Sequence, residues 1–319
     1  MNTTRTISET GSRIPYTVLG GPRWDRVRRH PFPLTLLVLG RGDRLFKSEM
    51  LKDLLARSLG EILWIEESES STDVEPLARD FPQVRFLLVT DRSTAGDRVN
   101  IGIDEARAPM VMVTWSDTRL VEFPSALLGS MEKSGVLCSV PVARTARNDP
   151  IPTWQAPLWK KRRFSIAYHV PRVEGERILF PFDYCGLYNR LKFAQTGGYD
   201  PGIVNPYWQK LDFGLRCFLW GERLLGTIRM SLTYTGSPPE EDTTPNEGYK
   251  KVWLKNMAVR TRREMGVLPV WRALDYMLHS DTGPLYAVKE FRIVRRWVRT
   301  HRFRFRRDPR DLIAGWERP

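Results

Sequence analysis

Short, mostly apolar runs alternate with longer segments in which apolar residues recur every three or four positions. The mostly apolar runs cover residues 34–39, 62–65, 84–90 and 110–114. The helix-like segments cover residues 50–59 and 95–106. Apolar runs of this length are typical of strands buried on both faces, and helical segments between them are typical of crossover connections. The pattern predicts an α/β fold with a mostly parallel central sheet.

The flanking parts of the chain follow other patterns. Gly and Pro residues are scattered among charges near the N-terminus, which predicts an irregular arm. Between Leu285 and Val298, apolar residues return at helical spacing. A Pro-, Thr- and acid-rich segment after residue 236 predicts a mobile loop or hinge. The expected organisation is an irregular N-terminal arm over 1–32, an α/β domain over 33–240 and a basic α-helical region over 241–319.

Positive charge is concentrated in the C-terminal region. The formal net charge of the chain is +13, and residues 251–319 hold 17 Lys and Arg against 7 Asp and Glu. Such a region can meet nucleic acid, anionic lipid or a phosphorylated substrate. The predicted helix fits either a membrane-surface helix that inserts Phe291, Val294 and Trp297, or a helix packed on its own domain. No nucleic-acid-binding module accompanies the charge, so we expect residues 285–307 to bind an anionic membrane surface.

Composition excludes several classes of protein. No apolar run approaches the roughly 18 residues of a membrane span. No continuous apolar segment follows the first charges, as it would in a secretion signal. The three cysteines are far apart in apolar surroundings, and the four histidines lack metal-ligand spacing. We therefore expect buried thiols in a cytoplasmic protein, at most peripheral to the inner face of the cell membrane.

Acidic residues follow two of the predicted strands. Glu66 and Glu67 come directly after residues 62–65, and Asp117 lies shortly after residues 110–114. Because the carboxyl ends of parallel strands meet at one edge of a sheet, these carboxylates can converge on one crevice. Acids at strand ends are also common as plain loop residues, and for Glu66 or Glu67 this alternative stays open.

The segment before Asp117 resembles the sugar-nucleotide site of family 2 glycosyltransferases. Asn100, Gly102 and Ile103 match a helix motif of that family, and residues 110–114 match the buried strand that follows it. In the family, this strand leads to an Asp-x-Asp motif that holds the metal of the nucleotide. The resemblance implies a GT-A fold and a glycosyltransferase.

Later segments keep the order and spacing of the same family. The sequence ILWIEESESSTD has glutamates where the family has aspartates at a strand end. A Gly-Gly-aromatic-Asp turn and the helix after it are also kept, by Gly197, Gly198, Tyr199, Asp200, Trp208, Asp212, Leu215 and Arg216. The resemblance extends from about Pro33 to Gly236. The Gly-rich turn at residues 40–42 also fits nucleotidyltransferases that make activated sugars, but the later segments fit the transfer enzymes better.

Three places depart from the family pattern. Trp115 stands where the metal motif has its first acid, and an aromatic ring there could stack on a base or sugar. Gln209 and Lys210 stand where a Glu-Asp pair supplies the base that deprotonates the acceptor. Residues 234–236 lack the His that many members use to complete metal binding. Lys210 can replace metal charge on a diphosphate, but a protonated Lys cannot act as a base.

The resemblance implies a set of site residues. Those expected to bind the nucleotide sugar are Leu39, Gly40, Glu66, Glu67, Arg98, Asn100, Trp115, Ser116 and Asp117. Asp117 is the expected ligand of a divalent cation, Mn²⁺ or Mg²⁺, that is weakly held or absent. Lys210 and Asp212 are the candidate catalytic residues. Residues 145–180 are expected to be irregular and to form an acceptor-side wall.

Two hypotheses follow. The first is an active glycosyltransferase that moves a sugar from a nucleotide-sugar donor to a glycan, lipid or polysaccharide precursor. The second is a catalytically degenerate relative that binds a nucleotide sugar, a glycan or a partner enzyme without turnover.

Overall fold

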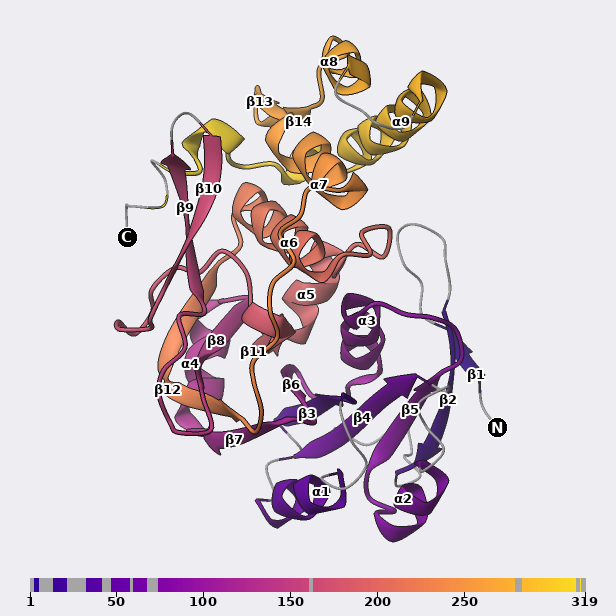
Figure 1. Cartoon of the computed structure of the whole chain (residues 1–319), viewed down its shortest axis with the longest axis vertical. Coiled ribbons are helices and arrows are strands. Elements are labelled where there is room, and N and C mark those ends of the chain that lie inside the picture. Colours follow the sequence, from indigo (N-terminus) through magenta and orange to yellow (C-terminus); the bar gives the residue numbers. More distant parts are fainter. Residues whose placement is uncertain are drawn as a thin grey trace.

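The chain forms one large mixed sheet covered by helices (Figure 1). The computed structural model describes residues 3–5, 14–21, 33–41, 47–57, 60–67, 74–160, 163–278, 283–313 and 316. The strands of the main sheet are β1 (Thr3–Arg5), β2 (Pro15–Gly20), β3 (Leu34–Leu39), β4 (Glu61–Glu67), β5 (Arg85–Val89), β6 (Met110–Trp115), β7 (Thr118–Glu122), β8 (Cys138–Arg144), β11 (Gly186–Asn189) and β12 (Leu224–Tyr234). Their order is β1-β2-β5-β4-β3-β6-β11-β8-β12-β7.

The centre of this sheet is parallel. Strands β5, β4, β3 and β6 pair in parallel, and every residue of β3 and β6 is buried. Antiparallel pairings of β2 with β5 and of β11 with β6 border this centre. The predicted α/β fold with a parallel central sheet is confirmed, because buried strands need apolar side chains on both faces.

Helices cover both faces of the sheet. They are α1 (Lys47–Ala56), α2 (Val74–Asp80), α3 (Ala95–Glu105), α4 (Ala126–Ser134), α5 (Arg190–Thr196), α6 (Pro206–Trp220), α7 (Glu247–Val252), α8 (Arg272–Leu278) and α9 (Pro284–Thr300). Shorter turns are η3 (Phe182–Tyr184), η4 (Trp253–Met257), η5 (Arg302–Arg304) and η6 (Pro309–Asp311). Helices α1 and α2 lie on one face and α3 on the other, while α6 lies between the sheet and the C-terminal helices (Figure 1).

The prediction of an irregular N-terminal arm is wrong for residues 15–20. These residues form β2, which pairs with β5 in the main sheet. Tyr16 is fully buried, and its hydroxyl donates to Oε1 of Glu105 at 2.7 Å. The Pro and Gly residues that suggested irregularity bound the strand, because Pro is tolerated at the first position of a strand and a Gly with positive φ can end it.

The prediction of an irregular segment over 145–180 is also wrong in its middle. Strands β9 (Trp154–Lys160) and β10 (Arg163–His169) form an antiparallel hairpin. Trp154 is fully buried against Gly226, where a Cβ atom would lie 2.3 Å from the indole ring. Trp154 therefore stabilises the core and offers no surface to an acceptor.

The C-terminal region packs on α6 through a second apolar core. Helix α9 buries Phe291, Val294 and Val298 in this core, and Trp297 stacks on Trp220 with ring centroids 5.8 Å apart. The prediction that this stripe inserts into a membrane is therefore wrong. The region also contains a short hairpin of β13 (Arg260–Arg262) and β14 (Met265–Val267). Within the described residues, no helix has both the length and the apolar character needed to cross a membrane. The three cysteines are free and buried, as predicted.

Candidate active site

The turn after β3 connects the ends of three strands. Gly40 N donates to Ile65 O at the end of β4 at 2.8 Å, and Ser116 N donates to Leu39 O at 2.9 Å. Gly40 permits this close approach, because a Cβ atom there would lie 2.2 Å from Cγ of Glu66. The turn therefore places the next residue, Arg41, at the carboxyl edge of the sheet.

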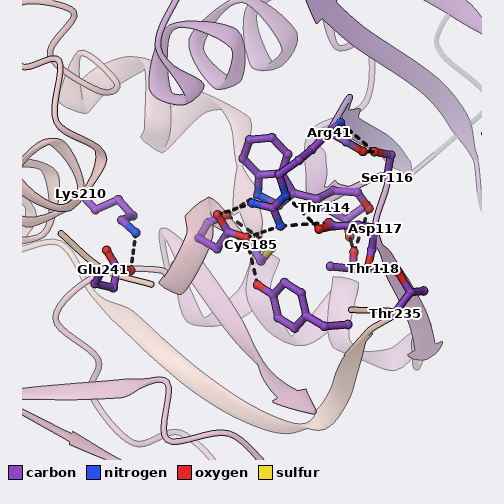
Figure 2. Close-up of polar contacts among 12 residues, drawn as sticks. Arg41, Thr114, Ser116, Asp117, Thr118, Cys185, Lys210, Thr235 and Glu241 are labelled. Carbon is purple, nitrogen blue, oxygen red and sulfur yellow. Dashed lines mark hydrogen bonds and ion pairs between the residues drawn. The ribbon is translucent and has the colours of Figure 1, made fainter. Parts of the chain in front are cut away.

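Arg41 joins two carboxylates from different parts of the chain. Its Nε and Nη2 donate to both oxygens of Asp117 at 2.9 Å, as Figure 2 shows. Its Nη1 and Nη2 donate to the oxygens of Asp183 at 3.2 and 2.9 Å. Burial opposes the charge of the guanidinium, but the two carboxylates more than offset it and raise the pKa of Arg41 above its ordinary value. Arg41 therefore remains protonated and fixed.

Asp183 is the buried partner of this pair of acids. It is 5% exposed, in η3, and the Tyr234 hydroxyl donates to its Oδ2 at 3.0 Å. Its backbone has a positive φ of 49°, a conformation that non-glycine residues seldom adopt. Burial raises the pKa of Asp183, while Arg41 opposes that shift. Our sequence reasoning missed this residue, although a lone acid inside the apolar segment 178–184 is a signal that could have identified it.

Trp115 supports Arg41 and leaves little surface for a ligand. Its side chain is 4% exposed, and the guanidinium of Arg41 lies 4.1 Å from the ring centroid. The guanidinium of Arg98 lies 5.5 Å from the same ring. The indole Nε1 donates to the carbonyl of Asp183 at 2.8 Å. The expected stacking of Trp115 on a base or sugar is therefore not supported, because cationic side chains already approach its ring.

Arg98 extends from α3 toward the turn after β3, at the carboxyl edge of the sheet, where the Arg41 group forms the candidate crevice. Its Nη1 donates weakly to Gly40 O at 3.4 Å, and its Nε has no hydrogen-bond partner among the described residues. Burial lowers the pKa of Arg98, while Glu67 has the opposite effect. A half-buried guanidinium with unused donors is suited to an anionic ligand, because a buried donor without a partner is costly.

Glu66 and Glu67 make internal contacts. Glu66 is 3% exposed and pairs with Nζ of Lys47 at 2.5 Å. Glu67 accepts from the backbone N and the hydroxyl of Ser93 at 3.2 and 2.9 Å. Glu66 therefore lies inside the domain, and Glu67 fixes the loop before α3.

Both polar atoms of the Asn100 side chain bind the backbone of Tyr199. Nδ2 of Asn100 donates to Tyr199 O at 2.8 Å, and its Oδ1 accepts from Tyr199 N at 2.8 Å. These two bonds attach the Gly-Gly-Tyr-Asp turn to α3. The expected nucleotide contact of Asn100 is therefore replaced by a structural contact.

The two candidate catalytic residues on α6 lie in different surroundings. Lys210 is 2% exposed, and its Nζ contacts Glu241 Oε1 at 2.5 Å, apart from the Arg41 group (Figure 2). Asp212 is fully buried and is bound by Lys255 Nζ at 3.0 Å and by Asn256 Nδ2 at 2.7 Å. The assignment of Asp212 as catalytic is therefore not supported, because no acceptor can reach it. Glu241, which our sequence reasoning did not single out, brings a carboxylate to Lys210.

The acids of the crevice do not fit a resident divalent cation. Such a site needs several free oxygen ligands. The four carboxylate oxygens of Asp117 and Asp183 all accept from Arg41, whose guanidinium lies between them. No group of three or more His, Cys, Asp or Glu residues in the described part of the chain could hold a metal. The assignment of Asp117 as a metal ligand is therefore not supported, because this side chain binds Arg41.

Comparisons with known proteins agree with this architecture. No protein-family model and no curated protein matches the sequence. The fold is similar to that in the crystal structure of GalNAc-T7 with UDP, GalNAc and Mn²⁺, with a TM-score of 0.58 and 13% identity over 91% of this chain. This chain spans 59% of that GalNAc-T7 chain. A crystal structure of S. aureus TarS matches 81% of this chain and 42% of its own, at 10% identity and a TM-score of 0.49.

The fold is therefore that of the GT-A glycosyltransferases, as the sequence resemblance implied.

Proposed function

We propose that this protein is a glycosyltransferase that moves a sugar from a nucleotide-sugar donor to a glycan, lipid or polysaccharide precursor. The observation that carries this proposal is the position of Arg41 and Arg98 at the carboxyl ends of the central strands. Ligands of open α/β sheets bind at this edge. A nucleoside diphosphate leaving group develops negative charge as the glycosyl bond breaks, and fixed cations there stabilise that charge.

Helix α3 adds to the same effect. Its N-cap residue is Thr94, whose hydroxyl accepts from Asp97 N, and Arg98 extends from its first turns. The backbone N and the hydroxyl of Thr94 donate to the carboxylate of Asp97, so this end of the helix already holds its own anion. The contribution of α3 to diphosphate binding is therefore the guanidinium of Arg98.

In this proposal, Lys210 and Glu241 lie where the acceptor hydroxyl binds. The Nζ of Lys210 is engaged with the carboxylate of Glu241, so we do not assign Lys210 as the base that removes a proton from the acceptor hydroxyl. Glu241 can accept that proton, and Lys210 holds its carboxylate at 2.5 Å. Lys210 is thus a positioning residue in this proposal.

The alternative function is binding of a nucleotide sugar without turnover. It is favoured by Lys210, because this residue replaces the acid that the family resemblance predicts at the base position. Release of nucleoside diphosphate separates the two functions. An active transferase binds the donor and releases the diphosphate, whereas a binding protein only binds it.

The test uses the full chain with uridine, guanosine, thymidine and cytidine diphosphate sugars. We expect one of these series to bind and to release its nucleoside diphosphate, slowly in water and faster with an acceptor. Glu241→Gln should lower that release about a hundredfold, the usual contribution of a general base, while donor affinity stays unchanged. The matched control is Glu240→Gln, a change at the exposed neighbour of Glu241 that should leave release as in the wild type. Binding without any release would favour the alternative, and no binding in any series would reject both.

A second proposal concerns the location of the protein at a cytoplasmic membrane surface. The apolar stripe of α9 is buried, but other large apolar side chains at α8 and at the start of α9 are exposed. They are Val270, Trp271, Leu274, Leu278, Leu285 and Tyr286. Arg292, Arg295, Arg296 and Arg299 lie exposed on α9, which contacts α8. Exposed apolar groups beside basic ones fit an anionic lipid surface.

Vesicle sedimentation tests this surface. The protein should bind vesicles that contain phosphatidylglycerol and should lose that binding with added salt or with pure phosphatidylcholine. Leu274→Glu with Leu278→Glu should weaken binding, whereas Leu191→Glu, an equally exposed site on α5, should not. Equal binding to both kinds of vesicle, or none to either, would contradict the proposal.

A further inference from the structure

The residues at the expected metal motif all contact one arginine. Trp115 lies under the guanidinium of Arg41 at 4.1 Å, and Asp117 accepts two hydrogen bonds from it at 2.9 Å. Between them, the hydroxyl of Ser116 accepts from the backbone N of Arg41 at 2.8 Å. We infer that the guanidinium of Arg41 replaces the divalent cation, so that diphosphate binding in this crevice is independent of metal. This inference rests on the proposed function, because it concerns the same crevice.

The geometry around Arg41 is that of a cation held by two acids. Asp117 follows β6, whereas Asp183 lies in η3 before β11, and the two carboxylates bind adjacent edges of one planar guanidinium that share Nη2. Bidentate pairs of this kind fix both the position and the plane of an arginine. The indole of Trp115 supports the guanidinium from a third side. A site that positions an organic cation so fully leaves the carboxylates no free oxygen pair for a metal.

The unused donors show where an anion would bind. A guanidinium has five N–H groups, and four contacts to carboxylate oxygens leave Arg41 one on Nη1. Arg98 has more, because its Nε is unpaired among the described residues and its contact with Gly40 is long, at 3.4 Å. The guanidinium groups of Arg41 and Arg98 both approach the ring of Trp115. Arg98 thus supplies most of the hydrogen bonds, and Arg41 supplies a fixed charge.

The two acids that bind Arg41 differ in exposure. The side chains of Arg41 and Asp117 are each 28% exposed, whereas that of Asp183 is 7% exposed. Among the described residues, the guanidinium is therefore more open to solvent toward Asp117, at the carboxyl edge of β6, than toward Asp183.

The first experiment measures the affinity of the wild-type chain for uridine, guanosine, thymidine and cytidine diphosphates by calorimetry. One set contains EDTA and the other contains Mn²⁺. We expect equal affinity in both sets for the diphosphate that binds. Binding that needs Mn²⁺ would overturn this inference and leave the proposed function standing. No binding in either set would overturn the proposed function together with this inference.

The second experiment measures the same affinities, in EDTA, for Arg41→Gln, Arg41→Lys and Arg98→Gln. Loss of hydrogen bonds to a charged ligand should weaken binding about tenfold or more in Arg98→Gln and in Arg41→Gln. Arg41→Lys keeps the charge and should bind better than Arg41→Gln. The matched control is Arg119→Gln, an exposed site on β7 that should bind as the wild type does. Unchanged affinity in both glutamine variants would overturn the inference, and thermal unfolding of each variant establishes that the measured protein is folded.

Discussion

Two clusters of acids and cations in this protein contain similar residues but differ in burial. In the crevice cluster, Arg41 binds Asp117 and Asp183, and the side chains of Arg41 and Asp117 are each 28% exposed. In the sealed cluster, Lys255 binds Asp200 and Asp212 at 2.8 and 3.0 Å, and Asp212 is fully buried. The first can meet a ligand and the second cannot. An acid in a family-like motif is therefore a site residue only where the fold leaves it accessible.

The sealed cluster joins three parts of the chain. Asp200 ends the Gly-Gly-Tyr-Asp turn, Asp212 lies on α6, and Lys255 lies in η4. Arg216 adds a second cation beside Asp212, at 3.3 Å. Because ions removed from water must be paired, this cluster fixes the C-terminal region on the domain.

The largest expected effect comes from breaking the sealed cluster. Asp212→Ala leaves Lys255 and Arg216 buried with too little negative charge, so the free energy of unfolding should fall by about 3–5 kcal/mol. Urea denaturation measures this change. Asp53→Ala is the control, since Asp53 forms an exposed pair with Arg57 and its loss should cost at most about 1 kcal/mol. A stable Asp212→Ala protein that had lost only turnover would instead make Asp212 catalytic.

The second effect is a dependence of stability on acid pH. Burial alone would raise the pKa of Asp200, but Lys255 and Lys251 outweigh it and hold the pKa well below its ordinary 3.8. The stabilisation from this group is therefore complete above pH 3.8 and is lost as the pH falls through the lower, folded value. Asp200→Asn should flatten the pH dependence of thermal unfolding in this acid range. A variant curve parallel to that of the wild type would contradict the assignment.

In the crevice cluster, the stability contributed by the buried acid should change with pH in the opposite direction. Burial raises the pKa of Asp183 above its ordinary 3.8, against the pull of Arg41. Its contribution to stability is complete below pH 3.8 and is lost as the pH rises through the folded value. Asp183→Asn removes the titrating group, so the variant should not show that decline. As the pH rises, the melting temperature of the wild type should therefore fall relative to that of the variant. A constant difference across this range would show that Asp183 does not titrate there.

The smallest effect on stability should come from Asp117. This side chain is partly exposed, so Asp117→Asn should cost no more than about 1 kcal/mol in urea denaturation. The affinity for the nucleoside diphosphate should nevertheless fall, because Asn holds the Arg41 guanidinium through one oxygen instead of two. A loss of stability as large as that of Asp212→Ala would remove the distinction between the two clusters.

Local patterns determined much of this fold. Apolar runs predicted β3, β4, β5 and β6 because a strand buried on both faces needs apolar side chains along its whole length. The same patterns placed Asp117 at the carboxyl edge of the sheet. They failed for β2, where turn-forming residues bound a short strand that is recognisable only through its pairing with β5.

Tertiary structure alone decided the site. Arg41 and Asp183 are 142 positions apart, and they meet because β11 inserts beside β6. Likewise, the helical stripe of α9 and the acid at Asp212 look the same in sequence whether they face solvent, a membrane or a neighbouring helix. Hydrophobic periodicity reports which residues share one face of an element, but the partner of that face depends on distant segments. The sequence by itself therefore determined the strand ends where a site could form, and only the packing of the chain decided that an arginine, held by two acids, lies there.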